Sequence, residues 1–348
     1  MNIHETYMHR CLQLARLGEG RVAPNPMVGS VLVYNDRIIG EGYHQQFGQP
    51  HAEVNCLESV KEADKQLFHS STLYVSLEPC AHFGKTPPCA DLIIRSGIKK
   101  VVIGCRDPFS KVDGKGIEKL KQAGIEVVEN IAEEACRQLN KRFFSFHERK
   151  RPFILLKWAQ TNDHFIGKEN ERLLVSHPFT NRLVHQWRSS HMAILVGTKT
   201  ALADNPSLNV RLASGNAPVR LVIDLNDVLP RTLKVFDNSQ RTIIFTYSNG
   251  HKKDNTEWVQ LKQGNDIAQQ IIAVCYSMNL QSILIEGGAK TLQSFIDAGL
   301  WDEAVCIQNK SLVVGNGIKA PILHHASFAK SEMIETDLHS YYTKTITS

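Results

Sequence analysis

The sequence lacks long apolar runs. No stretch of it approaches the roughly 18 consecutive apolar residues that a membrane-spanning helix requires. The first part of the chain, MNIHETYMHRCLQLARLGEG, also lacks the apolar core of a signal peptide. Both absences argue against a membrane partner and against secretion, and the cytoplasm is the expected location.

Blocks of like charge are missing as well. The chain has 40 Lys and Arg against 35 Asp and Glu, which gives a net charge of +5 spread along the sequence. Runs of about five or six like charges are typical of tails that bind nucleic acid, and none is present. No nucleic-acid partner is therefore expected, while enough basic residues remain to bind an anionic small molecule.

Cysteines are sparse, 8 among 348 residues, and form no pattern typical of a disulfide framework. Most lie in apolar segments such as VVIGC and IIAVC, which indicates small buried hydrophobic side chains. In a long intracellular chain the remaining ones are candidates for metal binding or catalysis. Only Cys80 and Cys89 have unusual surroundings, because Pro79 and Pro88 precede them.

Composition and length predict two globular domains. Hydrophobic residues make up 42% and charged residues 22%, close to the average for folded proteins, and no repeat or low-complexity tract is present. A chain of 348 residues is longer than one hydrophobic core usually organises. A basic, polar segment at 147–151 precedes Pro152 and a new apolar strand, so the predicted domains span residues 1–147 and 151–348.

Strand-like and helix-like segments alternate in both halves, which predicts α/β domains with largely parallel core sheets. The first half is expected to contain helices at 4–17, 51–64 and 89–97, a β-hairpin at 27–44, and strands at 71–80 and 99–105. The second half is expected to contain strands at 152–159, 193–197, 219–225, 241–248 and 281–288, and helices at 179–189, 265–279 and 289–298.

Three residues of the first half offer the donor atoms that zinc prefers. His51 offers a nitrogen, and Cys80 and Cys89 offer sulfurs at turns that the prolines mark. Cys89 is expected to begin a helix, where the helix dipole and free N–H groups stabilise a thiolate. Three protein ligands leave one position open, and an open position is typical of catalytic zinc.

Glu53 stands two residues after His51 and is not needed as a ligand. Zinc deaminases use such a Glu to carry a proton from a zinc-activated water to the leaving amine. A single His-x-Glu pair, or two cysteines eight residues apart, more often has no such role. The whole combination, with a strand leading into Cys80, favours a zinc-dependent deaminase.

The segments APNPMVGSVLV, GQPHAEVNCL and SLEPCAHFGKTPPCADLIIRSGIKKVV closely resemble one family. It is the family of bifunctional riboflavin biosynthesis proteins, in which a deaminase domain precedes a reductase domain, and the resemblance extends over nearly the whole chain. The eight-residue gap between the cysteines is part of it, because generic deaminases have two residues there. The resemblance implies a cytidine-deaminase-like three-layer α/β/α domain followed by a dihydrofolate-reductase-like α/β domain.

The resemblance also implies the first reaction and its residues. That reaction is the hydrolytic deamination of a phosphorylated diaminopyrimidinone, with Glu53 as proton shuttle beside bound Zn²⁺. The implied ligands of the zinc are His51, Cys80 and Cys89. The residues implied to contact the substrate are Asn25, His44, His82 and Lys85, of which Lys85 suits the phosphate by its charge.

The implied second reaction is the NADPH-dependent reduction of the ribosyl side chain. SILIEGGAK and AILVGTKT each place glycine between a strand and a helix, where backbone N–H groups can approach a phosphate. The resemblance assigns the cofactor to Ala159, Leu174, Thr200, Asp204, Gly288, Ala289, Lys290, Thr291, Leu292, Gln293 and Ser294. It assigns the reductase substrate to Asp163, Arg188, Leu208, Arg211 and Glu286.

Two positions of the second half depart from the family. His164 replaces a glycine, and Leu174 replaces a tryptophan that packs on the cofactor. One alternative is therefore a deaminase whose second domain has lost catalysis. Another is a binding protein with a structural zinc module, which would need a fourth protein ligand. A nucleic-acid deaminase is disfavoured by the modest net charge. The sequence leaves open whether the chain forms a homo-oligomer and whether it prefers NADPH to NADH.

Overall fold

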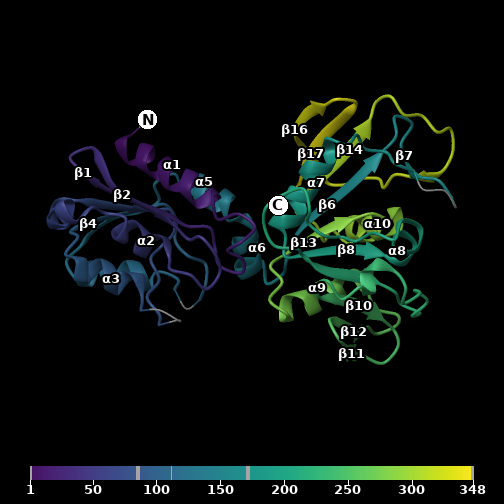
Figure 1. Ribbon diagram of the computed structural model, residues 1–348, viewed down its shortest axis with the longest axis horizontal. Coiled ribbons are helices and arrows are strands. Elements are labelled where there is room, and N and C mark those ends of the chain that lie inside the picture. Colours follow the sequence, from purple (N-terminus) through teal and green to yellow (C-terminus); the bar gives the residue numbers. More distant parts are fainter. Residues whose placement is uncertain (1, 84–86, 111, 170–172, 346–348) are drawn as a thin grey trace. The chain divides into compact units, whose positions relative to one another are not determined.

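The computed structural model describes residues 2–83, 87–110, 112–169 and 173–345. The contacts between residues divide the chain into two compact units, Met1–Lys150 and Arg151–Ser348, and each alternates strands with helices (Figure 1). Among the described residues, no helix is long and apolar enough to cross a membrane.

A five-stranded sheet forms the centre of the first unit, in the order β2-β1-β3-β4-β5. Its strands are β1 (Gly29–Tyr34), β2 (Arg37–Tyr43), β3 (Thr72–Val75), β4 (Lys100–Ile103) and β5 (Glu126–Val128). β1 is antiparallel to both of its neighbours, and β3, β4 and β5 are parallel. The predicted hairpin is confirmed, with Asn35 and Asp36 in the left-handed conformation that tight hairpin turns require.

Helices cover both faces of this sheet. They are α1 (Ile3–Arg16), α2 (Ala52–Glu58), α3 (Cys89–Ser96), α4 (Lys115–Gln122), α5 (Glu133–Leu139) and α6 (Lys141–Arg149). One buried cluster joins α1, α5 and α6 to the sheet through residues such as Met8 and Phe144, and another joins α2, α3 and α4 to it through Leu57 and Leu120. The expected three-layer α/β/α arrangement is therefore confirmed (Figure 1).

The helix predicted at 51–64 is too long. α2 ends at Glu58, and a 3-10 helix, η1 (Glu62–Ser70), follows it. The Ser59 hydroxyl donates to the carbonyl oxygen of Cys56 and accepts a hydrogen bond from the Glu41 backbone N–H. A serine side chain that bonds the backbone in this way competes with helical hydrogen bonds, which explains the early end.

A ten-stranded sheet forms the centre of the second unit, in the order β11-β12-β10-β9-β8-β13-β6-β14-β17-β16. The seven strands from β12 to β14 are parallel to one another, while β11, β17 and β16 pair antiparallel at the two ends. The strands are β6 (Phe153–Gln160), β8 (Ala193–Gly197), β9 (Val219–Ile223), β10 (Thr242–Thr246), β11 (His251–Lys253), β12 (Thr256–Gln260), β13 (Ser282–Glu286), β14 (Glu303–Asn309), β16 (Ala326–Ile334) and β17 (Asp337–Lys344). A separate pair is formed by β7 (Phe165–Gly167) and β15 (Ile318–Lys319).

Helices also cover both faces of the second sheet. They are α7 (Thr180–Ser190), α8 (Thr198–Asp204), α9 (Ile267–Ser277) and α10 (Ala289–Asp297), with a short 3-10 helix η2 (Lys234–Phe236). Ile271 of α9 and Phe295 of α10 belong to the cluster on one face, and Trp187 of α7 and Ala201 of α8 pack in the cluster on the other. The α/β class expected for this unit is confirmed, but helix α8 and strands β7, β11, β12, β14, β15, β16 and β17 were not predicted.

Gly42 fixes the distance between α2 and the first sheet. A Cβ atom at this position would lie 2.2 Å from the backbone nitrogen of Cys56 and 2.6 Å from the carbonyl oxygen of Ala52. Both atoms belong to the backbone of α2, which cannot give way as a flexible side chain does. The helix that begins after His51 therefore packs directly on β2.

We expect Gly42→Ala to lower the free energy of unfolding of the first unit by about 1–3 kcal/mol, because the added methyl group overpacks this contact. Urea unfolding followed by circular dichroism measures the change. The control is Gly167→Ala, whose Cβ atom would meet, among the described residues, only Ile318 Cδ1, at 4.0 Å. Equal effects of the two substitutions would contradict the close packing of α2 on β2.

Candidate metal centre and nucleotide site

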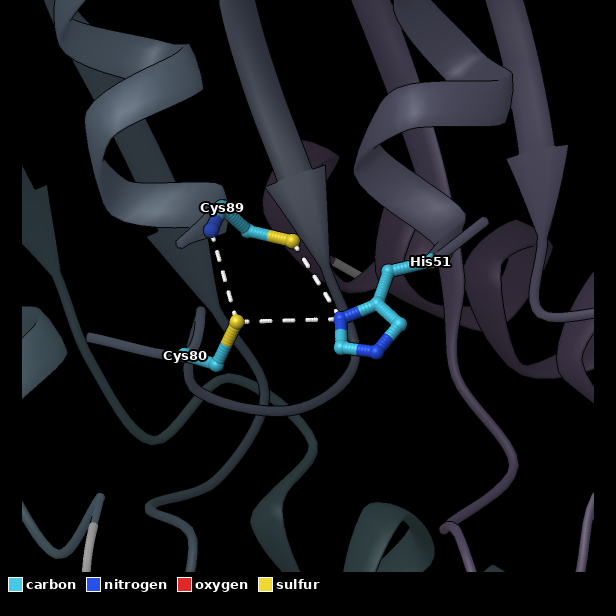
Figure 2. A group of neighbouring side chains, drawn as sticks. All are labelled: His51, Cys80 and Cys89. Carbon is cyan, nitrogen blue, oxygen red and sulfur yellow. Dashed lines mark hydrogen bonds between the residues drawn. The ribbon is translucent and has the colours of Figure 1, made fainter. Parts of the chain in front are cut away.

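Three elements of the first unit bring His51, Cys80 and Cys89 together (Figure 2). His51 is the residue just before α2, Cys89 is the first residue of α3, and Cys80 lies on the segment that follows β3. Their ligand atoms all lie within 4.8 Å of one another. In the described part of the chain, no fourth His, Cys, Asp or Glu joins this group.

The spacing of these atoms fits a zinc ion. His51 Nδ1 lies 3.7 Å from Cys80 Sγ and 3.4 Å from Cys89 Sγ. A nitrogen and a sulfur bound to one tetrahedral zinc ion lie about 3.6 Å apart, given the usual bond lengths. With three protein ligands, one coordination position remains for water or substrate, as in catalytic zinc sites.

The N-terminus of α3 stabilises the sulfur of Cys80. The backbone N–H of Cys89 donates to Cys80 Sγ at 3.3 Å. Hydrogen bonding from Cys89 lowers the pKa of the Cys80 thiol against the effect of burial, and His51 lowers it further. The sequence predicted this benefit for Cys89 itself, but the free N–H group points to the other cysteine, and the pKa of Cys89 is raised by its hydrogen bond with Cys80 and by burial.

Glu53 lies in the first turn of α2 and is almost fully buried, with 3% of its surface exposed. Burial raises the pKa of its carboxyl to about 7, although the nearby His51 opposes the change. A carboxyl group with a pKa near neutrality can both accept and release a proton at physiological pH. This property suits the proton shuttle predicted from the sequence.

A hydrogen-bonded pair lies beside the metal ligands. Asn25 Nδ2 is 3.1 Å from His44 Nε2, and His44 Nδ1 is 3.0 Å from the carbonyl oxygen of Pro50. The rings of His44 and His51 are in edge contact, with centroids 5.4 Å apart. Burial lowers the pKa of His44, which favours its neutral form. Two of the predicted substrate residues are thus placed next to the metal group.

His82 and Lys85 belong to the segment between the two cysteines. The His82 ring lies in edge contact with Phe109, at 5.9 Å between centroids, and its Nδ1 atom is buried without a hydrogen-bond partner among the described residues. Lys85 lies outside the described residues. A buried nitrogen without a partner is the kind of group that a bound ligand satisfies.

In the second unit, two turns meet at the carboxyl ends of the paired strands β8 and β13. A Cβ atom on Gly197, the last residue of β8, would lie 2.5 Å from Thr291 Oγ1. Gly287 and Gly288, after β13, have positive φ angles of 94° and 70°, and a Cβ atom on either would lie 3.0–3.1 Å from Thr200. The glycines therefore let the two turns pack closely on Thr200 and Thr291. Ligands of open α/β sheets bind at such strand ends, which makes these turns a candidate phosphate site.

A buried ion pair lies next to these turns. Arg188 of α7 donates to both oxygens of Glu286, at 3.1 and 2.6 Å. Lys157 of β6 pairs in register with Glu286 of β13, so both side chains leave the sheet on the face that α7 covers. Burial would raise the pKa of the Glu286 carboxyl, but the positive charges of Arg188 and Lys157 outweigh this effect and lower it.

Arg211 approaches the same face from the segment after α8. Its backbone N–H donates to His185 Nδ1 at 3.2 Å, and its guanidinium donates to Asn209 Oδ1 at 3.0 Å. Arg188 donates to the carbonyl oxygen of Asn209, so both predicted substrate arginines gather around one residue. Two guanidinium groups beside the half-buried Lys157 suit a phosphorylated ligand.

Comparison with known proteins agrees with this geometry. The RibD C-terminal domain family matches residues 152–343, and the cytidine and deoxycytidylate deaminase zinc-binding region matches residues 1–105. The riboflavin biosynthesis protein RibD of Aquifex aeolicus is 38% identical over 331 residues, which cover 91% of this chain and 92% of the relative. The RibD protein of Escherichia coli is 33% identical over 323 residues, with 86% of each chain covered.

The chain belongs to the RibD family of riboflavin biosynthesis proteins. A solved structure from Thermotoga maritima, described as a diaminohydroxyphosphoribosylaminopyrimidine deaminase/5-amino-6-(5-phosphoribosylamino)uracil reductase, is 37% identical with a TM-score of 0.89. The matched region covers 98% of this chain and 99% of the Thermotoga maritima chain. The first unit of this RibD chain is therefore cytidine-deaminase-like, and the second is the dihydrofolate-reductase-like domain expected from the sequence.

His164, which departs from the RibD pattern, sits where glycine has an advantage. Its φ angle is 65°, in the left-handed region that glycine adopts without strain. Histidine is among the residues that tolerate this conformation. Its ring is 2.9 Å from Gln160 Nε2, and its backbone N–H donates to the carbonyl oxygen of Thr161. The turn that follows β6 therefore forms with histidine in place of glycine.

The remaining predicted residues of the RibD reductase site lie in different environments. Asp163 accepts hydrogen bonds from Thr161 Oγ1 and from the backbone of Val314 and Gly315, so its carboxylate already holds a loop. Leu208 and Leu292 are buried in the core, whereas Leu174 is 76% exposed. Ala159 lies on β6, Asp204 ends α8, and Ala289, Lys290, Gln293 and Ser294 lie on α10.

Sequence reasoning missed three residues at these sites. Lys157 was detectable as the one charged side chain in the apolar strand segment FILLKWA, because a buried strand rarely carries an ammonium group. His185 gave no such signal, since a lone histidine on a helix is common. Asp107 follows β4 in the segment CRDPF and is 7% exposed. Burial raises the pKa of its carboxyl to about 7, and the charge of Cys80 adds a smaller rise.

We expect the purified chain to contain zinc in an equimolar amount and His51→Ala to lose most of it, because that substitution removes the single nitrogen ligand. Elemental analysis of the dialysed protein measures the metal directly. His69→Ala is the control, since His69 is exposed and lies outside the ligand group. Full zinc content in His51→Ala would contradict the assignment.

Proposed function

We propose that this chain catalyses two steps of riboflavin biosynthesis. The first is the hydrolytic deamination of 2,5-diamino-6-(5-phosphoribosylamino)pyrimidin-4(3H)-one. The second is the NADPH-dependent reduction of the ribosyl side chain, which gives 5-amino-6-(5-phosphoribitylamino)uracil. The observation that carries the proposal is the convergence of His51, Cys80 and Cys89 beside buried Glu53, in a chain that belongs to the RibD family.

In the deamination, water adds to the amino-bearing ring carbon and ammonia leaves, so the ring gains a carbonyl oxygen. When bound to His51, Cys80 and Cys89, zinc supplies the acidity that makes water a nucleophile near neutral pH. Glu53 takes a proton from this water and delivers it to the leaving amine. Asn25 and His44, which lie beside His51, hold the pyrimidine against this centre.

In the reduction, a hydride from NADPH goes to C1 of the opened ribose, and a proton completes the product. The turns that follow β8 and β13 hold the nucleotide, because glycine in such strand–helix turns lets backbone N–H groups approach a phosphate. Arg188 and Arg211 hold the substrate phosphate. Lys157 and Glu286 face the sugar from neighbouring strands, so the reaction relies mainly on positioning.

Glu53→Gln is expected to retain zinc and lower the rate constant of ammonia release by about 100- to 10,000-fold, the usual contribution of an acid–base group. The amide keeps the shape of the side chain but cannot accept the proton. Ammonia release and zinc content are measured on the same preparation. A variant with normal ammonia release would rule out the shuttle and favour a structural zinc module.

Arg188→Ala is expected to lower kcat/KM for the deaminated substrate by at least about tenfold, because it removes hydrogen bonds to a charged group. NADPH oxidation measures this value, and ammonia release in the first unit should not change. Arg182→Ala is the matched control, since Arg182 is exposed on the same helix. If wild-type protein oxidises no NADPH with the deaminated substrate, the chain is a deaminase only.

A further inference from the structure

Glu78 is a buried carboxylate that the deamination chemistry does not use. It lies two residues before Cys80, and only 4% of its surface is exposed. Among the described residues, no Lys or Arg forms an ion pair with it. Burial of an unpaired charge is costly, so its hydrogen bonds must compensate.

Four backbone N–H groups supply that compensation. Glu78 Oε2 accepts from Asp107 at 3.2 Å and from Gly114 at 3.0 Å. Glu78 Oε1 accepts from Gly116 at 2.9 Å and from Ile117 at 3.2 Å. Two of these donors lie in the first turn of α4, where free N–H groups and the helix dipole favour a negative charge.

The Glu78 carboxylate therefore links two segments to the one that carries Cys80. These are residues 107–109, which follow β4, and residues 114–117, which form the start of α4. The fit is tight as well as polar, because a Cβ atom on Gly116 would lie 1.9 Å from the carbonyl oxygen of Pro79. Neither part can move away from the Cys80 segment without losing buried hydrogen bonds.

The tied segment reaches the predicted substrate residue His82. Asp107 Oδ1 accepts a hydrogen bond from the Phe109 backbone N–H at 2.8 Å, which holds the backbone that carries the phenyl ring. That ring lies against His82 on one side, at 5.9 Å, and against His147 at 5.1 Å. Phe109 thus forms a wall next to His82, whose buried Nδ1 has no hydrogen-bond partner in the described part of the chain.

We propose that Glu78 is a positioning residue that sets the affinity of the deaminase site for its pyrimidine, by holding Asp107 and Phe109 beside His82. The inference rests on the proposed deaminase function. Glu78 itself touches neither the substrate nor the metal. Its contribution is therefore to substrate binding and not to the chemical step.

The test is Glu78→Gln, which keeps the size of the side chain but turns an amide group toward two N–H donors. The KM for the diaminopyrimidinone is expected to rise at least about tenfold, because buried N–H donors without an acceptor no longer hold the segment with Asp107 and Phe109 in place. The value of kcat should stay within about threefold, and zinc should stay equimolar. Phe109→Ala should give the same rise in KM, although the hydrogen bonds to Glu78 remain intact.

Asp224→Asn is the matched control. Asp224 is also buried and accepts from two backbone N–H groups, of Val228 and Leu229, but it lies in the second unit. It should leave the KM of deamination unchanged. A further variant tests the steric contact: Gly116→Ala should also raise KM, because its Cβ atom would meet the carbonyl oxygen of Pro79.

Two results would overturn the proposal. One is an unchanged KM in both Glu78→Gln and Phe109→Ala, and the other is loss of zinc from Glu78→Gln, which would make Glu78 a support of the metal ligands. If Glu78→Gln does not fold, Phe109→Ala decides the question alone. Absence of ammonia release in the wild-type protein would instead refute the proposed function, so the two failures are distinguishable.

Discussion

The deaminase half depends on two helix N-termini that meet at one point. His51 immediately precedes α2, and Cys89 begins α3, so the backbone of each helix fixes one ligand. The N–H group of Cys89 also holds the sulfur of Cys80. The position of α2 is fixed in turn by its close packing on Gly42 of β2. The ligand geometry therefore follows from the packing of the three layers.

The reductase half holds several charged side chains on one face of its sheet. Arg188, Glu286 and Lys157 are neighbours there, and each would be costly to bury alone. Together they leave a surplus of positive charge at the strand ends, next to turns with little side-chain bulk. An anionic nucleotide and a phosphorylated sugar need both features.

The α/β class and the three metal ligands could be predicted from the sequence. Pro79 and Pro88 marked the turns around the cysteines, and alternating patterns gave the α/β class. Contacts between distant segments were not predictable: the Ser59 hydroxyl that ends α2 acts through β2, and the Cys89 N–H reaches Cys80 only in the folded chain. β16 was missed because most of its residues are exposed, so no apolar run marks it. Lys157 was overlooked although a lysine within an apolar strand is a usable signal.

The central claim is that one chain first removes an amino group at a zinc centre and then reduces the product. The most direct measurement incubates the zinc-loaded chain with the diaminopyrimidinone and NADPH, and follows ammonia and NADPH over time. Ammonia should form first, and NADPH should then be oxidised in an equal amount, with the ribitylamino compound as the product. Oxidation of NADPH without ammonia release, or no ammonia from zinc-loaded protein, would contradict the account.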